Sequence, residues 1–202
     1  MAKSLSLKQI LKEGNELYGE NPIDFTDKEC ATGHSYGDLY EREIVLRKGT
    51  RLLEIGISSG GSLWTWRRYL KDYSLTAVDL SPIWPKVRPF QQELEADANI
   101  ELRWNSNSTD ALSYQGMEPF DYIIDDGDHN PQTQADTFTV AYGLLKPGGT
   151  YFIEDVVRQD FVAPLRKHIN TIDPNAVVEE YLGHRIADGR WDDIVIIVRK
   201  PK

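Results

Sequence analysis

The chain has 202 residues and a formal net charge of −9 at pH 7, with 23 Lys and Arg against 32 Asp and Glu. This acidic balance argues against duplex DNA or RNA as the main partner, because affinity for phosphate backbones comes from clustered Lys and Arg. No apolar stretch is long enough to cross a bilayer, and the N-terminus lacks the apolar segment of a signal peptide. The chain has a single cysteine, Cys30, and so no internal disulfide, which fits a cytoplasmic protein. Its length fits one domain over 1–202, and we expect that domain to bind neither nucleic acid nor membranes.

Residues 1–47 are predicted to form a helix and a lid-like segment. Four apolar side chains recur at helical spacing and predict an amphipathic helix over 4–19: Leu7, Ile10, Leu11 and Leu17. No comparable pattern follows over 20–43, and irregular segments of this length inside compact domains are usually functional or mobile.

From residue 48 onwards, short apolar runs alternate with helical patterns. The expected strands are 51–56, 74–80, 99–105, 121–126 and 150–156. The expected helices are 60–72, 131–145 and about 160–170, the second of which begins at an Asn130 N-cap followed by Pro131. This alternation predicts a doubly wound parallel sheet with helices on both faces, a three-layer α/β/α architecture.

Two segments depart from the alternation. Pro82, Pro85 and Pro89 follow the second strand and allow only short helical pieces there. At the C-terminus, 176–182 and 193–200 are strand-like runs with no helical pattern between them. We therefore expect an antiparallel hairpin at one edge of a seven-stranded, mostly parallel sheet.

The turn after the first strand, "LLEIGISSGGSLW", is a candidate ligand loop, because open α/β sheets bind ligands beyond the carboxyl ends of their strands. Gly56 and Gly60 let the backbone approach a ligand closely, and Asp79 at the end of the second strand can accept both ribose hydroxyls. The spacing is not G-x-G-x-x-G, since Ser58 stands at the second position. Glu54 would repel a pyrophosphate and suits a ligand with an amine or sulfonium cation. The alternative interpretation is a plain tight turn.

Acidic residues close the fourth and fifth strands, as Asp125-Asp126 and Glu154-Asp155. Adjacent parallel strands lie about 4.8 Å apart, so these ends converge, and carboxylates gathered without cations repel one another. Such sites suit Mg²⁺, Ca²⁺ or Mn²⁺, whereas no Cys/His spacing favours zinc. A metal lowers the pKa of a hydroxyl, and His129 is placed to accept the proton. The alternative is a solvated loop with an Asx turn before the helix at 131.

Five segments together resemble the class I S-adenosylmethionine-dependent methyltransferases, in particular the metal-dependent sugar O-methyltransferases of macrolide and aminocoumarin biosynthesis. The segments are "GHSYGDLYERE", "LLEIGISSGGSLWTWRRYL", "LTAVDLS", "FDYIIDDGDH" and "LLKPGGTYFIEDV". The resemblance covers about 33–157 and implies a Rossmann-like fold over 48–202. The sequence departs from the family at Ser58, Ser59 and Ser106, the last standing where the family often has Asp.

The resemblance also implies roles for individual residues. S-adenosyl-L-methionine would contact Glu54, Gly56, Ser58, Gly60, Ser62, Asp79, Leu80, Asn107, Ser108, Asp125, Tyr36 and Tyr40. Asp126 and His129 would be catalytic, and Mg²⁺ or another divalent cation would be bound by Asp126, Glu154 and Asp155. His34 and Arg158 would contact the substrate.

The expected function is methylation of a hydroxyl on a small molecule, such as a sugar or a glycosylated natural product. The acceptor pocket would then come from 20–43, 157–165, the hairpin or a second subunit, which leaves a homo-oligomer open. One alternative is an NAD-dependent oxidoreductase, which NADH and not S-adenosylhomocysteine would stabilise. The other is a non-catalytic cofactor-binding module, in which removing Asp126 or His129 would abolish no activity.

Overall fold

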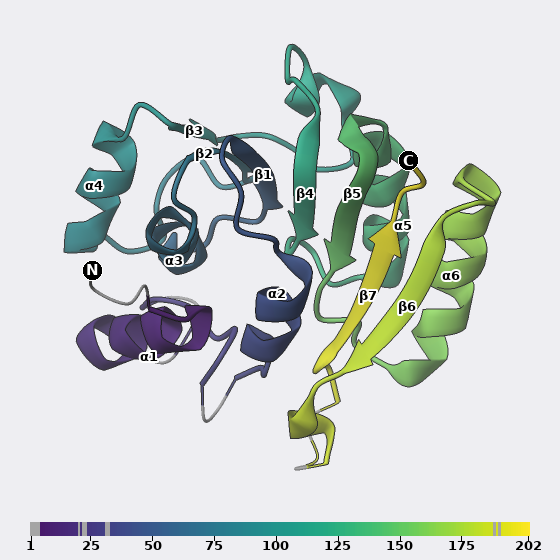
Figure 1. Cartoon of the computed structure of the whole chain (residues 1–202), viewed down its shortest axis with the longest axis horizontal. Helices are drawn as coiled ribbons and strands as arrows, with labels where there is room; N and C mark the ends of the chain where they lie inside the picture. The colour runs from purple at the N-terminus through teal and green to yellow at the C-terminus, as the bar shows by residue number, and fades with distance from the viewer. Residues whose placement is uncertain (1–4, 20, 22–23, 31–32, 188, 190) are drawn as a thin grey trace.

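The computed structural model of the chain describes residues 5–19, 21, 24–30, 33–187, 189 and 191–202. Its centre is a seven-stranded sheet in the order β3-β2-β1-β4-β5-β7-β6, in which β7 is antiparallel to both of its neighbours (Figure 1). The strands are β1 Thr50–Ile55, β2 Tyr73–Val78, β3 Ile100–Arg103, β4 Phe120–Asp125, β5 Leu145–Ile153, β6 Val177–Leu182 and β7 Ile194–Arg199. The predicted sheet and its C-terminal hairpin are confirmed.

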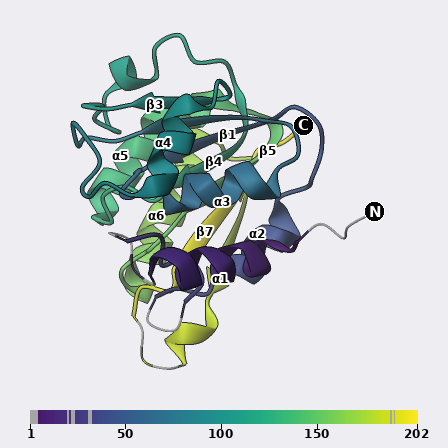
Figure 2. The same cartoon turned by 90° about the vertical axis from the view of Figure 1, so that its left-hand side faces the viewer.

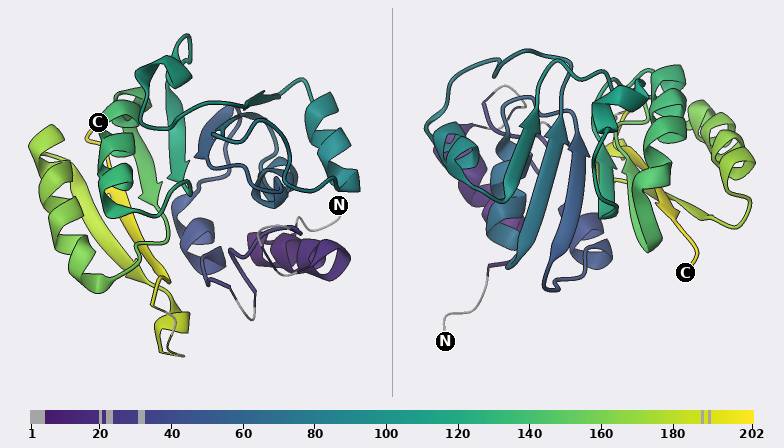
Figure 3. Two further views of the ribbon diagram at one scale, coloured as in Figure 1. Left: turned by 180° about the vertical axis from the view of Figure 1, so that it is seen from behind. Right: turned by 90° about the horizontal axis from the view of Figure 1, so that it is seen from above.

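Helices cover both faces of the sheet, as predicted. They are α1 Leu7–Tyr18, α2 Gly37–Glu43, α3 Gly61–Tyr69, α4 Pro89–Ala96, α5 Pro131–Ala141 and α6 Gln159–Ile172. Figure 1 looks onto α2 in front of the sheet, and the reverse view in Figure 3 brings α5 and α6 to the front. Figure 2 shows α1 beside α3 and α2. None of the helices that the structure describes combines the length and apolarity needed to cross a membrane.

The two cores follow from the alternation of side chains along each strand. In β4, Tyr122 and Ile124 pack with α1 to α4, whereas Ile123 between them packs with α5 and α6. β7 divides in the same way: Val195 and Ile197 face the first core, and Ile196 faces the second. Because both faces are covered, the central strands are apolar throughout, which made them visible in the sequence.

Several elements differ from the sequence-based expectation. The irregular stretch 20–43 contains α2, which is too short for a periodic pattern to reveal. Pro89 begins α4 at the first helical position, where its missing N–H costs nothing. The KPGG segment was expected to follow a helix ending near residue 145, but it lies within β5, where the pairing shifts register between Phe120 and Tyr122. α1 begins at Leu7, because Ser6 caps it through a reciprocal pair of hydrogen bonds with Gln9.

Candidate active site

A cavity of about 350 Å³ opens where the strand order reverses between β1 and β4. Six residues expected to contact a cofactor line it: Gly56, Ser58, Asp79, Leu80, Asn107 and Ser108. Asp126 also lines the cavity. Ser62 lines a smaller neighbouring cavity of about 30 Å³, together with Gly56 and Ser58. The parallel strand ends therefore bring together loops that are far apart in the chain.

Asp79 holds the glycine loop in place from the end of β2. Its Oδ2 accepts the backbone N–H groups of Ile57 at 2.7 Å and Ser58 at 3.2 Å. Its Oδ1 accepts the N–H of Ser81 at 2.7 Å. Since these bonds come from fixed backbone groups, the carboxylate is oriented before any ligand arrives.

Gly56 is required by both its conformation and its surroundings. Its φ of 94° disfavours any residue with a side chain, and a Cβ there would lie 2.1 Å from the carbonyl oxygen of Asp126. The loop after β1 therefore packs directly on the loop after β4.

We expect Gly56→Ala to lower the free energy of unfolding by about 2–5 kcal/mol, since a left-handed alanine costs about 1–2 kcal/mol and an overpacked contact about 1–3 kcal/mol. Gly116→Ala is the matched control, because Gly116 has a φ of 78° and a Cβ there would meet no described atom within 4 Å. It should lose only the conformational part, about 1–2 kcal/mol. Urea denaturation measures both, and equal losses in the two variants would contradict the close contact with Asp126.

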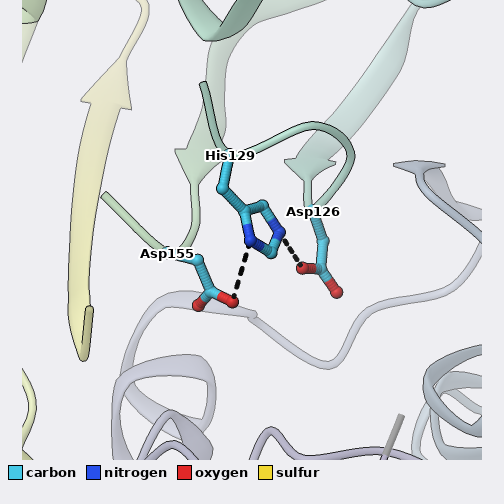
Figure 4. A group of neighbouring side chains, drawn as sticks. All are labelled: Asp126, His129 and Asp155. Carbon is cyan, nitrogen blue, oxygen red and sulfur yellow. Dashed lines mark ion pairs between the residues drawn. The ribbon is translucent and has the colours of Figure 1, made fainter. Parts of the chain in front are cut away.

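Asp126, His129 and Asp155 form a group suited to a metal ion. The imidazole lies between the two carboxylates, with Nε2 at 3.4 Å from Asp126 Oδ1 and Nδ1 at 3.7 Å from Asp155 Oδ2 (Figure 4). One ligand atom from each residue lies within 4.8 Å of the other two. Asp155 has a φ of 52°, a left-handed conformation that turns the chain after β5 and is typical of functional sites.

The charges of these groups are strongly perturbed. The contact with Asp126, reinforced by the negative charge of Asp155, raises the pKa of His129 to about 9. Although burial opposes it, the positive charge of Lys28 lowers the pKa of Asp126 below its usual range. Asp126 is therefore ionised at neutral pH, and the imidazole is protonated in the ion-free protein.

Glu154, the third residue of the expected metal-binding set, does not join this group. Its carboxylate accepts hydrogen bonds from the Lys28 ammonium and the Tyr40 hydroxyl instead. Burial raises the pKa of Glu154, against the opposing charge of Lys28. Consecutive residues after β5 have different neighbours, since Asp155 contacts His129 while Glu154 contacts Lys28 and Tyr40.

The N-terminal segment supplies an orienting layer for the acidic group. The Tyr36 hydroxyl donates to Asp155 Oδ1 at 2.6 Å, and His34 Nε2 lies 3.1 Å from Asp155 Oδ2. The His34 and Tyr36 rings stack with centroids 4.8 Å apart. Although burial lowers it, hydrogen bonds with Asp155 and Asp193 raise the pKa of His34 to about 10.

Tyr36, Tyr40 and His34 thus contact the carboxylates and not the cavity, where a cofactor or substrate role was expected for them. All three are buried, so the loop histidine is not the solvated residue that a lone loop His usually is. The two hydroxyls and the imidazole orient the carboxylates of Asp155 and Glu154.

Lys28 was not identified from the sequence. Its side chain is only 2% exposed, and its Nζ lies 2.6 Å from Asp126 Oδ2 and 3.9 Å from Glu54 Oε1. A single lysine in an irregular segment carries no pattern, and lysines are normally exposed. One signal could have revealed it: the carboxylates gathered at the strand ends repel one another unless a positively charged group lies among them.

Three other residues expected to contact the cofactor lie outside the cavity. Glu54 is fully buried and lines neither cavity, and burial raises its pKa to about 7 against the charge of Lys28. Asp125 is buried, with its carboxylate accepting the Tyr151 hydroxyl at 3.4 Å. Gly60 precedes α3, and a Cβ there would meet the Trp84 ring at 2.7 Å. Their contact with a cofactor therefore stays a prediction.

Arg158, the other candidate for substrate contact, pairs with a neighbouring acidic residue. Its guanidinium is exposed and forms two hydrogen bonds with Asp160, of 2.8 and 2.9 Å, at the start of α6. Its contact with a substrate stays a prediction.

Residues 53–156 match the family model described as "Methyltransferase domain". The chain belongs to this methyltransferase family. The matched region contains the glycine loop after β1, Asp79, and both strand ends that carry Asp126 and Asp155. The resemblance seen in the sequence motifs is thereby confirmed.

Two curated relatives from Streptomyces methylate sugar-bearing molecules according to their names. The chain is 30% identical over 134 residues to 8-demethyl-8-(2-methoxy-alpha-L-rhamnosyl)-tetracenomycin-C 3'-O-methyltransferase of Streptomyces olivaceus, covering 61% of this chain and 32% of the relative. It is 31% identical over 137 residues to L-olivosyl-oleandolide 3-O-methyltransferase of Streptomyces antibioticus, again covering 61% and 32%. The chain thus matches about a third of the length of these relatives.

The fold is similar to that of a solved methyltransferase. The structure of MycE methyltransferase from the mycinamycin biosynthetic pathway, in complex with Mg, S-adenosylhomocysteine (SAH) and mycinamycin VI, superposes with a TM-score of 0.71 at 19% sequence identity. The match covers 99% of this chain and 56% of that chain. At this identity the likeness establishes the Rossmann-like fold, including the terminal hairpin.

Proposed function

We propose that this protein is an S-adenosylmethionine-dependent O-methyltransferase, assisted by Mg²⁺ or a similar divalent ion, that methylates a hydroxyl of a small molecule. One observation carries the proposal: Asp126 lines the cavity at the switch point and also belongs to the group formed with His129 and Asp155. A ligand in the cavity and an ion in that group would therefore be neighbours, as transfer between them requires.

The cavity fits the cofactor, which supplies a methyl group on a sulfonium. Its volume of about 350 Å³ lies within the usual range for ligand sites. Asp79 would accept the ribose hydroxyls, Asn107 and Ser108 would border the adenine, and Gly56 would allow close approach of the backbone. Glu54 would not contact the cofactor's ammonium directly, because the Lys28 amine lies beside it.

The acidic group fits a hard divalent ion. Asp126 and Asp155 would supply carboxylate oxygens, the ligands that Mg²⁺ prefers, and an ion there would lower the pKa of an acceptor hydroxyl. His129 would accept the hydroxyl proton as the methyl group is transferred. Only a neutral imidazole can do this, and positive charge bound by both carboxylates would lower the raised pKa of His129.

We also propose a sugar or a glycosylated natural product as the acceptor, on the strength of the curated relatives' names. The proposal treats residues 1–202 as one domain, in which 1–47 forms the helix and lid-like segment and 48–202 the core. The contacts of Tyr36 and Tyr40 with Asp155 and Glu154 support this arrangement. A second subunit would be one source of further acceptor contacts.

A thermal-shift matrix tests the proposal. Ligands that bind the folded state raise the unfolding midpoint, by roughly 5–10 °C at a hundredfold excess over Kd for a chain of this size. We expect a shift with S-adenosylhomocysteine, and a shift with Mg²⁺ that EDTA abolishes. Stabilisation by NADH without any by S-adenosylhomocysteine would refute it.

Transfer of a labelled methyl group to a panel of rhamnosides and olivosides then identifies the class of acceptor.

Asp79→Asn should weaken S-adenosylhomocysteine binding by about 10–100-fold. The variant loses a charged acceptor worth about 1.5–3 kcal/mol and turns an amide toward the N–H groups of Ile57 and Ser58. Isothermal titration calorimetry measures the affinity. Asp72→Asn, at an exposed position just before β2 and so at the opposite end of that strand from Asp79, is the control and should bind as the wild type does. Unchanged affinity in Asp79→Asn would remove Asp79 from the cofactor site.

A further inference from the structure

Lys28 is surrounded by three carboxylates that we term the inner carboxylate group: Glu54, Asp126 and Glu154. Its Nζ lies 2.6 Å from Asp126 Oδ2, hydrogen-bonds Glu154 Oε2, and lies 3.9 Å from Glu54 Oε1. The lysine, Glu54 and Glu154 are each at most 2% exposed. An ammonium has three N–H groups, so this environment matches its donor number.

The inner carboxylate group is built by the sheet itself. Glu54 lies in β1 one residue before its end, and Asp126 and Glu154 directly follow the neighbouring strands β4 and β5. The backbone N–H of Glu154 donates to the Asp125 carbonyl oxygen at 2.9 Å, and that of Asp126 donates to the Ile55 carbonyl oxygen at 2.9 Å. These bonds fix the carboxylates in place, whereas Lys28 comes from the separate N-terminal segment.

The group has more capacity for positive charge than one lysine uses. Neither oxygen of the buried Glu54 carboxylate has a hydrogen-bond partner of normal geometry among the described residues. The Glu54 carboxylate therefore lies beside the ammonium without a close hydrogen bond to it, and Ser62 and Trp66 are its other polar neighbours. Without Lys28, three converging carboxylates would form the kind of oxygen-rich site that binds divalent ions.

We propose that Lys28 is a built-in cation that occupies the inner carboxylate group and thereby confines a divalent ion to the outer group of Asp126, His129 and Asp155. The outer half of this inference rests on the function proposed above. Asp126 belongs to both groups: its Oδ2 faces Lys28, and its Oδ1 faces His129. Lys28 is thus a positioning residue for Asp126, and it keeps Glu154 from serving as a ligand.

Counting bound Mn²⁺ tests the inference, by electron paramagnetic resonance of the free ion during titration of the purified chain. We expect one Mn²⁺ per chain in the wild type and two in Lys28→Met, which keeps most of the stem and removes the ammonium. The additional ion should disappear in Lys28→Met/Glu154→Gln. Lys28→Arg retains the charge and should bind as the wild type does. An unchanged count in Lys28→Met overturns the inference.

A single variant covers the case in which Lys28→Met does not fold. Glu154→Gln in the wild-type background should keep the Mn²⁺ count and an affinity within about threefold, whereas Asp155→Asn should lose the ion. Loss of the ion in Glu154→Gln would make Glu154 a ligand and overturn the inference. A wild type that binds no Mn²⁺ would refute the metal part of the proposed function, while a gain in Lys28→Met would still establish the inner site.

Discussion

His129→Ala is expected to lower kcat for methyl transfer by about 10²–10⁴-fold, the usual contribution of a general base. Cofactor affinity should persist, because His129 does not line the cavity at the switch point. Initial rates at saturating S-adenosylmethionine and Mg²⁺, together with calorimetric titration of S-adenosylhomocysteine, separate the two effects. The wild-type rate should also fall as the pH is lowered, since a protonated imidazole accepts no proton.

His168→Ala is the matched control for that experiment. His168 lies on α6, and its ring Nε2 lies 2.8 Å from the Thr139 hydroxyl. Its removal should leave the rate within about twofold of the wild type. A His129→Ala enzyme that keeps its rate, with metal and cofactor bound, would show that another group accepts the proton.

Lys28→Ala is expected to lower the free energy of unfolding by about 3–5 kcal/mol, the usual consequence of removing one partner from a buried ion pair. The loss arises because Asp126 and the buried Glu154 would keep their positions without the cation that now lies between them. Urea denaturation in EDTA at pH 7 measures it. The loss should shrink at lower pH, where Asp126, whose pKa the lysine no longer lowers, takes up a proton.

Lys86→Ala provides the comparison for an exposed pair. Lys86 contacts Asp24 at 3.1 Å with its side chain 54% exposed, and such pairs contribute about 0–1 kcal/mol. A loss below about 1 kcal/mol in Lys28→Ala as well would mean that the inner carboxylate group relaxes or takes up water once the ammonium is gone.

The fold was predictable because its elements are encoded locally. The central strands are buried on both faces and read as continuous apolar runs, and their alternation with helices leaves few topologies. The sequence patterns did not predict short elements such as α2. They also did not predict the irregular start of β5, where Leu145 pairs with Phe120 but Thr150 pairs with Tyr122. Their conformations depend on partners that are distant in the chain.

The cavity residues were also predictable, because parallel strands present their carboxyl ends at one edge. Gly56, Asp79, Asn107 and Asp126 each follow a different strand and meet in one cavity for that reason. Glu154 was assigned to the metal group by the same argument, which locates a strand end but not the direction of a side chain. That direction is seen only in its contacts with Lys28 and Tyr40, which come from the distant N-terminal segment.

By itself, the sequence determined the order of the strands and helices, the family, and the acidic strand ends that require positive charge. Only the tertiary structure decided where that charge comes from. The Lys28 ammonium is held by Asp126 and Glu154, which lie 98 and 126 positions away in the chain. Local patterns report burial and periodicity within a segment, whereas charge compensation in a buried cluster depends on which distant side chains meet. The acidic strand ends are therefore compensated in part by a cation of the protein itself, the Lys28 ammonium.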